Sequence, residues 1–351
     1  MRVGIYLTNQ HPLRSDMVSA LEEQLVMVRA ARDWGWDAVA TGQHYLSDGL
    51  RQLQLVPFLS RLAAEAGGMT GIAGVLLLTL HNPVEVAEHI ASLDVIWKGN
   101  FVFGVGLGYR DMEFDAFRIP RGGRVSRFEE CLSLIKRLWT EDGVSFDGAT
   151  CRLDRVTMTI RPVQHPHPPI WLAATTDQAV RRAARWGDTW FISPHATWGT
   201  VARQLSLYRE ELQRQGKPFP RILPMFREIF CARDRRTAQE LAGPSLAEKY
   251  GAYARWGQDV ALPAQESFDR PFEELCRDRF ILGSPEECYE QLRPSWETLG
   301  VNYLLLRMHW SGLPLSASLQ SMRLVSDELL PSLRRVPEPG AGSPPHGTSG
   351  G

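Results

Sequence analysis

The chain has 351 residues, 44% of them hydrophobic, and its 39 lysines and arginines nearly balance its 40 aspartates and glutamates. A formal net charge of −1 argues against nucleic-acid partners and against electrostatic membrane anchoring. The five cysteines stand singly, with no C-x-x-C pair, which predicts reduced thiols rather than a disulfide framework or a zinc module. No signal peptide opens the chain, and the longest apolar stretch, 70–80, is far shorter than a membrane-spanning helix. We therefore expect a cytoplasmic protein with no membrane partner.

Short β-branched runs alternate with amphipathic segments along most of the chain. Eight runs are expected to be strands: 2–7, 37–41, 69–77, 100–105, 169–173, 188–192, 222–232 and 301–307. Because each run is apolar enough for burial on both faces, the alternation favours an α/β fold with a closed, eight-stranded (β/α) TIM-type barrel. An open, doubly wound sheet is the alternative.

The segments between these runs carry helix signals. Asn82-Pro83 can open a helix, because asparagine caps free amides and proline loses nothing at the first helical position. Ser284 and Glu287 have the spacing of a capping box, and an apolar stripe follows them as far as Leu299. These signals predict helices at the positions that a barrel requires.

Two segments are too long for ordinary barrel connections. They are 109–123, after the fourth strand, and 241–280, after the seventh, and such insertions often form lids or binding loops. The Pro/Gly/Ser-rich stretch 336–351 is expected to be disordered. We therefore predict one barrel domain over 1–335 and a disordered tail.

In a barrel of this kind the active site lies at the carboxyl ends of the strands. After the fourth strand stands G-V-G-L-G, in which Gly106, Leu107 and Gly108 lack the spacing of a dinucleotide-binding motif. These glycines either let a flat ligand or its phosphate approach the backbone or allow the strand to bend at the rim.

After the fifth strand, Ala174, Thr175 and Thr176 precede a helix. Hydroxyls at a helix start suit a phosphate, although an ordinary threonine N-cap is the alternative. Arg124 and Arg127 begin the helix after the first insertion. They would supply matching cations, unless they are solvated surface residues.

His44 follows the second strand and is the first candidate for a general acid or base, the alternative being a packed structural histidine. Glu113 is the second candidate and His309 the third. The nine histidines show no metal-binding spacing, so no metal is expected. Four aromatic residues are expected either to line an apolar cleft or to belong to the core: Trp190, Trp198, Phe226 and Trp310.

Two long segments carry a family resemblance: HNPVEVAEHIASLDVIWKGNFVFGVGLGYRDMEFDAF (81–117) and HPPIWLAATTDQAVRRAARWGDTW (167–190). With them the chain resembles the luciferase-like family of flavin- or deazaflavin-dependent oxidoreductases over about residues 1–335. The resemblance implies a barrel that binds FMN, or the deazaflavin coenzyme F420, across its carboxyl face.

Positions matched to the family imply roles for individual residues. Gly74-Val75 falls where members often hold a non-prolyl cis peptide against the flavin ring. His44 matches a histidine associated with proton transfer, and Glu113 matches an acidic residue after the fourth strand. The residues implied around the phosphate and ribityl chain are Gly106, Leu107, Gly108, Arg124, Ala174, Thr175 and Thr176.

The sequence departs from the family pattern beside His44. The family's E-H-H stretch reads Gln43-His44-Tyr45, so the acidic neighbour that would orient His44 is absent. This departure leaves open a non-catalytic flavin-binding protein as an alternative to an enzyme.

The resemblance also implies the reaction and the partners. The expected enzyme is a monooxygenase that takes reduced FMN from a separate flavin reductase and uses molecular oxygen on a small organic substrate. Hydride transfer with the deazaflavin is the alternative. His44 is expected to manage a proton while the 241–280 insertion closes as a lid. Family members are frequently dimers, so we expect a homodimer.

Overall fold

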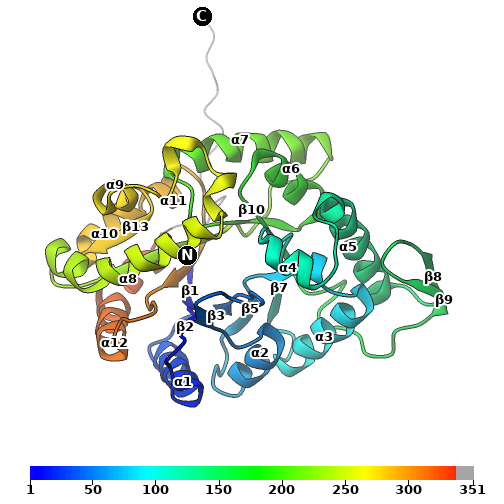
Figure 1. The fold of residues 1–351 in the computed structure, drawn as a ribbon, viewed down its shortest axis with the longest axis horizontal. Helices are drawn as coiled ribbons and strands as arrows, with labels where there is room; N and C mark the ends of the chain where they lie inside the picture. Colours follow the sequence, from blue (N-terminus) through cyan, green and yellow to red (C-terminus); the bar gives the residue numbers. More distant parts are fainter. Residues whose placement is uncertain (337–351) are drawn as a thin grey trace, which may run out of the picture.

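The computed structural model describes residues 1–336, which form a ring of parallel strands surrounded by helices (Figure 1). The barrel strands are β1 (Arg2–Leu7), β3 (Ala38–Thr41), β5 (Thr70–Ala73), β7 (Phe101–Gly106), β10 (Ile170–Ala174), β11 (Thr189–Ile192), β12 (Pro224–Cys231) and β14 (Tyr303–Arg307). They pair in the order β10-β11-β12-β14-β1-β3-β5-β7, and β7 pairs with β10 to close the ring. The predicted TIM-type barrel is confirmed, and the open sheet is excluded.

Helices cover the outside of the ring because each turns an apolar face toward the strands. The longer ones are α1 (Met17–Asp33), α2 (Leu55–Ala63), α3 (Pro83–Ile96), α5 (Arg124–Thr140), α6 (Asp177–Trp186), α7 (Trp198–Arg214), α8 (Arg235–Arg255), α10 (Pro285–Leu292) and α12 (Leu315–Leu324). After α12, the chain continues through η5 (Val325–Leu329) and α13 (Leu330–Arg334). No helix within residues 1–336 is long and apolar enough to cross a membrane.

The predicted helix starts are confirmed. The Asn82 side chain accepts a hydrogen bond from the Val84 amide at 2.9 Å, and Ser284 and Glu287 form the expected capping box. The expectation that the next helix continues to Leu299 is wrong. Proline lacks an amide hydrogen and clashes with the preceding turn, so α10 ends at Leu292 and Pro294 begins the separate α11 (Pro294–Glu297).

The third predicted strand, 69–77, is divided in two. β5 ends at Ala73, the Gly74–Val75 peptide is cis, and the chain resumes as β6 (Leu76–Leu77) before η1 (Leu78–Leu80). Both β5 and β6 pair with β7. The division therefore places a bend at the carboxyl end of the strand, where the ring opens.

Three small sheet elements lie outside the barrel, and the sequence had not indicated them. β12 is long enough that its second half leaves β14 and pairs with β13 (Phe280–Gly283). The hairpin of β8 (Val144–Asp147) and β9 (Arg152–Val156) projects from the outer rim at the right of Figure 1. A short antiparallel pair joins β2 (His11–Pro12) to β4 (Leu50–Arg51).

Both insertions have secondary structure of their own. The first contains α4 (Asp111–Ala116) and η2 (Arg121–Gly123), and α8 begins six residues before the second predicted insertion and runs into it. η3 (Gln258–Ala261), η4 (Ala264–Glu266) and α9 (Phe272–Cys276) complete the second insertion. Residues 337–351, which hold almost all of the tail predicted to be disordered, lie outside the described residues.

Aromatic side chains fill the inside of the ring below its mouth. Tyr6 and Phe226 stack with ring centroids 4.0 Å apart. Trp171 lies tilted against Phe191 and edge to face with Tyr303. This layer closes the barrel from below, as close packing of inward-facing side chains does in barrels of this size. Open space is left at the carboxyl ends of the strands.

Candidate active site

A cavity of about 510 Å³ opens at the carboxyl ends of the strands. His44 lines it, as do all nine residues predicted to contact a cofactor: Gly74, Val75, Gly106, Leu107, Gly108, Arg124, Ala174, Thr175 and Thr176. The structure therefore gathers at one site residues from four strand ends and, with Arg124, from the start of α5.

The cis Gly74–Val75 peptide forms one wall of the cavity. The Tyr6 hydroxyl donates a hydrogen bond to the Gly74 carbonyl and holds it in place. A Cβ added at Gly106 would lie 3.0 Å from Val75 Cγ2, whereas one at Gly104 would lie 1.9 Å from the Ala73 carbonyl oxygen. Gly104 is thus required by strand packing, while Gly106 keeps the cavity wall flat beside the cis peptide.

The start of α6 forms a second wall. Thr176 is its N-cap, because its Oγ1 accepts a hydrogen bond from the Ala179 amide at 3.3 Å. The N-cap alternative is therefore confirmed for this threonine, which also lines the cavity. The free amides and the positive end of the helix dipole would favour an anion at this wall. Arg124 lines the same end of the cavity and donates to the Arg121 carbonyl at 3.0 Å.

Two arginines differ from the expectation at this end. Arg127 does not line the cavity: its guanidinium donates to the Thr79 carbonyl at 2.8 Å and the His81 carbonyl at 3.1 Å, which fixes η1. Arg182 on α6 does line it and pairs with Glu129 at 3.2 Å. Sequence reasoning missed Arg182 because it stands one and a half turns inside its helix rather than at a strand end.

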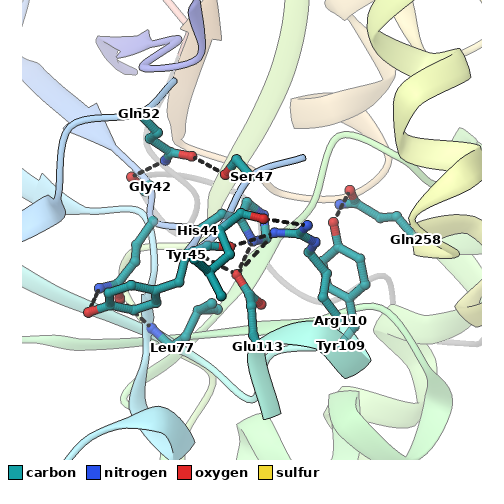
Figure 2. A network of polar contacts seen from close by, with 12 residues as sticks. Gly42, His44, Tyr45, Ser47, Gln52, Leu77, Tyr109, Arg110, Glu113 and Gln258 are labelled. Carbon is teal, nitrogen blue, oxygen red and sulfur yellow. Dashed lines mark hydrogen bonds and ion pairs between the residues drawn. The ribbon is translucent and has the colours of Figure 1, made fainter. Parts of the chain in front are cut away.

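His44 has an acidic partner after all. Nδ1 of His44 lies 3.0 Å from Oε1 of Glu113, and the same oxygen accepts from the Tyr45 amide at 2.8 Å (Figure 2). The Glu113 side chain is fully buried, whereas that of His44 is 15% exposed and lines the cavity. The carboxylate that is missing beside His44 in the sequence is therefore supplied by α4, from the first insertion.

Arg110 fixes this pair in place. Its guanidinium donates to the carbonyls of Tyr45 at 2.8 Å and Leu46 at 3.1 Å, and it lies 3.5 Å from Glu113 Oε1. The guanidinium also lies over the Trp256 ring, just beyond α8, with its central carbon 4.4 Å from the ring centroid. One buried arginine thus ties the loop after β3 to both insertions, as charge-assisted hydrogen bonds and cation–π contacts can do.

A second set of contacts connects the insertions across the cavity. The Tyr109 hydroxyl donates to Gln258 Oε1 at 2.8 Å (Figure 2). Nε2 of Gln258 lies 2.6 Å from Nε2 of His195. Burial, reinforced by nearby cations of which Lys249 is the strongest, holds the pKa of His195 well below its ordinary value. Neutral His195 therefore accepts from the amide through Nε2, and its Nδ1, 3.3 Å from the Tyr250 hydroxyl, carries the proton.

The remaining sequence candidates lie apart from the cavity or in its aromatic base. His309 does not line it: Nε2 contacts the Leu313 carbonyl at 3.2 Å, and burial lowers its pKa to about 4. Phe226 lines the cavity, but Trp190 and Trp310 are core residues. Trp198 packs 4.3 Å under the Arg227 guanidinium. No group of three or more His, Cys, Asp or Glu side chains in residues 1–336 is arranged to hold a metal ion.

Comparison with known proteins agrees with this geometry. The family described as luciferase-like monooxygenase matches residues 1–303. The chain belongs to this family. It is therefore an enzyme of the oxidoreductase class, as the sequence predicted.

Individual relatives cover nearly the whole chain. Monooxygenase RslO1 from Streptomyces bottropensis superposes with a TM-score of 0.82 at 26% identity, over 95% of this chain and 99% of that one. The alkanal monooxygenase alpha chain of Photorhabdus laumondii is 22% identical over 95% of this chain and 98% of its own. An F420-dependent secondary alcohol dehydrogenase, at 16% identity and a TM-score of 0.75 over 95% of this chain and 99% of that one, shares the fold.

Proposed function

We propose that the protein is a monooxygenase that binds reduced FMN and uses molecular oxygen on a small organic substrate. The cavity at the barrel mouth carries this proposal, because one of its ends suits a phosphate and one of its walls suits a flat ring. When bound, reduced FMN would supply the electrons that activate oxygen, chemistry that no side chain provides. The chain's own residues then bind, orient and protect the reactants.

The phosphate end is formed by Arg124, Arg182 and the start of α6. Arginine guanidinium groups and helix amides are the donors that phosphates favour in proteins. At Gly108, φ is +80°, so its backbone adopts a conformation that favours glycine and comes close to the ligand space. These features support binding of the FMN phosphate tail at this end. The same cavity continues to Gly74, Val75 and Gly106, so the flavin ring would lie against those residues.

His44 is proposed to manage a proton beside the ring. Glu113 holds its Nδ1, which fixes the orientation of the imidazole and leaves Nε2 without a hydrogen bond in the described residues. Buried carboxylates orient catalytic histidines in this way in other enzymes. The pairing argues against a non-catalytic flavin-binding protein, because that alternative was based on the lack of an acidic partner for His44.

The two insertions are proposed to exclude water from the reaction. Tyr109 comes from the first insertion and Gln258 from the second, and their hydrogen bond joins the two insertions at the cavity wall. Opening the lid requires this contact and the His195–Gln258 contact to break. Such closure keeps reactive species away from bulk water.

Hydride transfer with the deazaflavin coenzyme is the second candidate function. The phosphate end and the Gly74–Val75 wall would suit either cofactor, since both carry a tricyclic ring and a phosphorylated tail. Titration of the purified protein with FMN and with F420, each oxidised and reduced, tests the choice by changes in absorbance and fluorescence. Tight binding of reduced FMN, with oxygen uptake above that of free flavin in a substrate panel, supports the monooxygenase. Tight binding of F420 alone would overturn it.

Three further expectations stay predictions from the family resemblance: delivery of reduced FMN by a separate reductase, assembly as a homodimer, and a cytoplasmic location. Gel filtration with light scattering tests the dimer directly. Oxygen uptake with a generic flavin reductase and NADH, compared with chemically reduced FMN, tests whether a delivered flavin supports turnover.

A further inference from the structure

Arg307, the last residue of β14, presents an incompletely satisfied guanidinium to the cavity. Its side chain is only 7% exposed, yet it lines the cavity wall. Nη1 donates to Glu228 Oε1 at 3.3 Å, whereas Nε has no hydrogen-bond partner among the described residues. Because a buried donor without an acceptor costs free energy, a ligand that brings an acceptor to this wall gains that free energy.

Arg307 also shares its only carboxylate partner among the described residues. Its carboxylate partner, Glu228, is shared with the Lys249 ammonium and with Trp310 Nε1, the latter at 2.6 Å. Glu228 therefore cannot satisfy the Arg307 guanidinium alone, because its two oxygens also accept from Lys249 and Trp310. Among the described residues that line the cavity there are three arginines and no aspartate or glutamate. Since a buried charge requires a counter-charge, this side of the cavity favours an anion.

The cofactor phosphate cannot be that anion if it lies where the proposed function puts it. β14, which ends at Arg307, is three strands from β10, which leads into α6, so Arg307 and the start of α6 lie at separate parts of the mouth. The Arg307 guanidinium is instead 4.5 Å from the Tyr6 ring, whose hydroxyl bonds the Gly74 carbonyl. Arg307 is thus one aromatic ring away from the wall assigned to the flat cofactor ring.

We propose that Arg307 is a substrate-binding residue and that the substrate carries an anionic oxygen, as in a carboxylate or an ionised enol. The guanidinium would bind this oxygen and orient the substrate beside Gly74. Gln10 and Tyr253 line the same cavity and are hydrogen bonded to each other at 3.3 Å. They would bind neutral polar groups of the same molecule. The proposal rests on the proposed function, because it leaves the Arg124 end to the cofactor phosphate.

The test uses 1-naphthoate and the neutral, similarly shaped 1-naphthamide as probes, with binding measured by titration calorimetry. Wild-type protein is expected to bind naphthoate about tenfold more tightly than naphthamide, the effect expected of one charge-assisted hydrogen bond. R307M should abolish this preference, and R124M should leave it intact. Equal affinities in the wild type, a preference kept in R307M, or one lost in R124M would each overturn the proposal.

Cofactor titrations on the same variants separate substrate binding from cofactor binding. R307M is expected to bind FMN as tightly as the wild type does, and saturating FMN should leave naphthoate binding in place. Loss of FMN binding in R307M, or displacement of naphthoate by FMN, would assign Arg307 to the cofactor and overturn the proposal. If the wild type binds no FMN, the proposed function fails, while the naphthoate preference still decides the role of Arg307.

R307M could also unfold, because it leaves Glu228 with one cation fewer. Circular dichroism shows whether R307M is folded, and R307K is used in place of R307M if it is not. Lysine keeps the charge but not the forked donors, so R307K should show an intermediate preference for naphthoate. An unchanged preference in folded R307K would show that the forked donors of Arg307 do not bind the carboxylate, and would overturn the proposal. The absence of any preference in the wild type overturns the proposal without any variant.

Discussion

Glu113 and His44 stand 69 positions apart in the sequence, and their side chains meet at 3.0 Å beside the cavity. The contact joins a helix of the first insertion to the loop after β3. It gives His44 a fixed orientation that its neighbours in the sequence do not provide. The candidate catalytic group is therefore a pair rather than a lone histidine.

H44Q tests the role of the imidazole. Glutamine is of similar size and cannot accept and return a proton, so we expect kcat to fall by roughly 10²–10⁴-fold, the usual contribution of general acid–base catalysis. The dissociation constant for FMN should change little. Turnover is measured with reduced FMN, and H89Q, at an exposed position of α3, is the control. Full turnover in folded H44Q would remove His44 from the mechanism.

E113A tests the buried support beneath His44. Removal of the carboxylate leaves the buried Arg110 guanidinium without its anion, so the free energy of unfolding should fall by roughly 3 kcal/mol or more. Urea denaturation measures this loss. D115A, at an exposed position of the same helix, is the matched control and should change stability by less than about 0.5 kcal/mol. Equal stabilities of E113A and D115A would contradict a structural role for the ion pair.

R124Q separates phosphate binding from ring binding. FMN and riboflavin differ only in the phosphate, so the loss of a phosphate-binding arginine should weaken FMN by about tenfold and leave riboflavin almost unchanged. R127Q is the matched control, since Arg127 is bound to backbone carbonyls away from the cavity. Fluorescence titration measures both ligands. The same preference for FMN over riboflavin in R124Q as in the wild type would contradict the assignment.

Alanine substitutions at two glycines of the same strand should behave differently. A Cβ at Gly104 would lie 1.9 Å from a backbone oxygen, so G104A should yield little folded protein. In G106A the nearest atom is Val75 Cγ2 at 3.0 Å, and a small shift can relieve this contact. G106A should therefore fold, with reduced affinity for the cofactor ring. Soluble yield, circular dichroism and FMN titration of the two variants test this prediction. Normal folding of G104A would contradict it.

The pH dependence of the free energy of unfolding should reveal the lowered pKa of Lys249. Burial, together with the Arg307 charge, lowers the pKa of Lys249 from 10.5 to about 7 in the folded protein. Between about pH 7 and pH 10 the unfolded chain therefore binds one more proton than the folded chain, so this group makes the free energy of unfolding rise with pH. The slope is at most about 1.4 kcal/mol per pH unit.

Comparison of variants isolates this rise from the other groups that titrate. Glu228, Arg307, His195 and two tyrosines, Tyr250 and Tyr253, also face Lys249 or adjoin it. K249M lacks the amine, so its stability relative to the wild type should fall as pH rises across this range. K249R stays charged throughout and should show the same trend. Urea denaturation at three pH values measures both, and a pH-independent difference would contradict the lowered pKa.

Much of the barrel was predictable from local patterns. Eight apolar runs alternating with capped amphipathic helices have few ways to bury every strand on both faces, and a closed ring is one of them. The predicted element boundaries were wrong where strand pairing or backbone stereochemistry outweighed the hydrophobic pattern. The 69–77 run is divided at Gly74–Val75, β13 pairs with an overhanging half of β12, and Pro294 ends a helix whose apolar stripe continues.

The positions of the site residues followed from the sequence, since the carboxyl ends of parallel strands must meet at one face. The residues matched to a cofactor contact at strand ends line the cavity for that reason, and Arg124 joins them from the start of α5. Contacts between side chains distant in the chain could not be inferred in the same way. Three such features depend on how the insertions and strand ends pack: the Glu113–His44 pair, the binding of Arg127 to backbone carbonyls, and the Arg307 Nε that lacks a partner among the described residues. Hydrophobic periodicity and helix capping depend on residues a few positions apart, so the sequence alone determines them. Charge pairing and burial depend on residues far apart in the chain, so only the tertiary structure decides them.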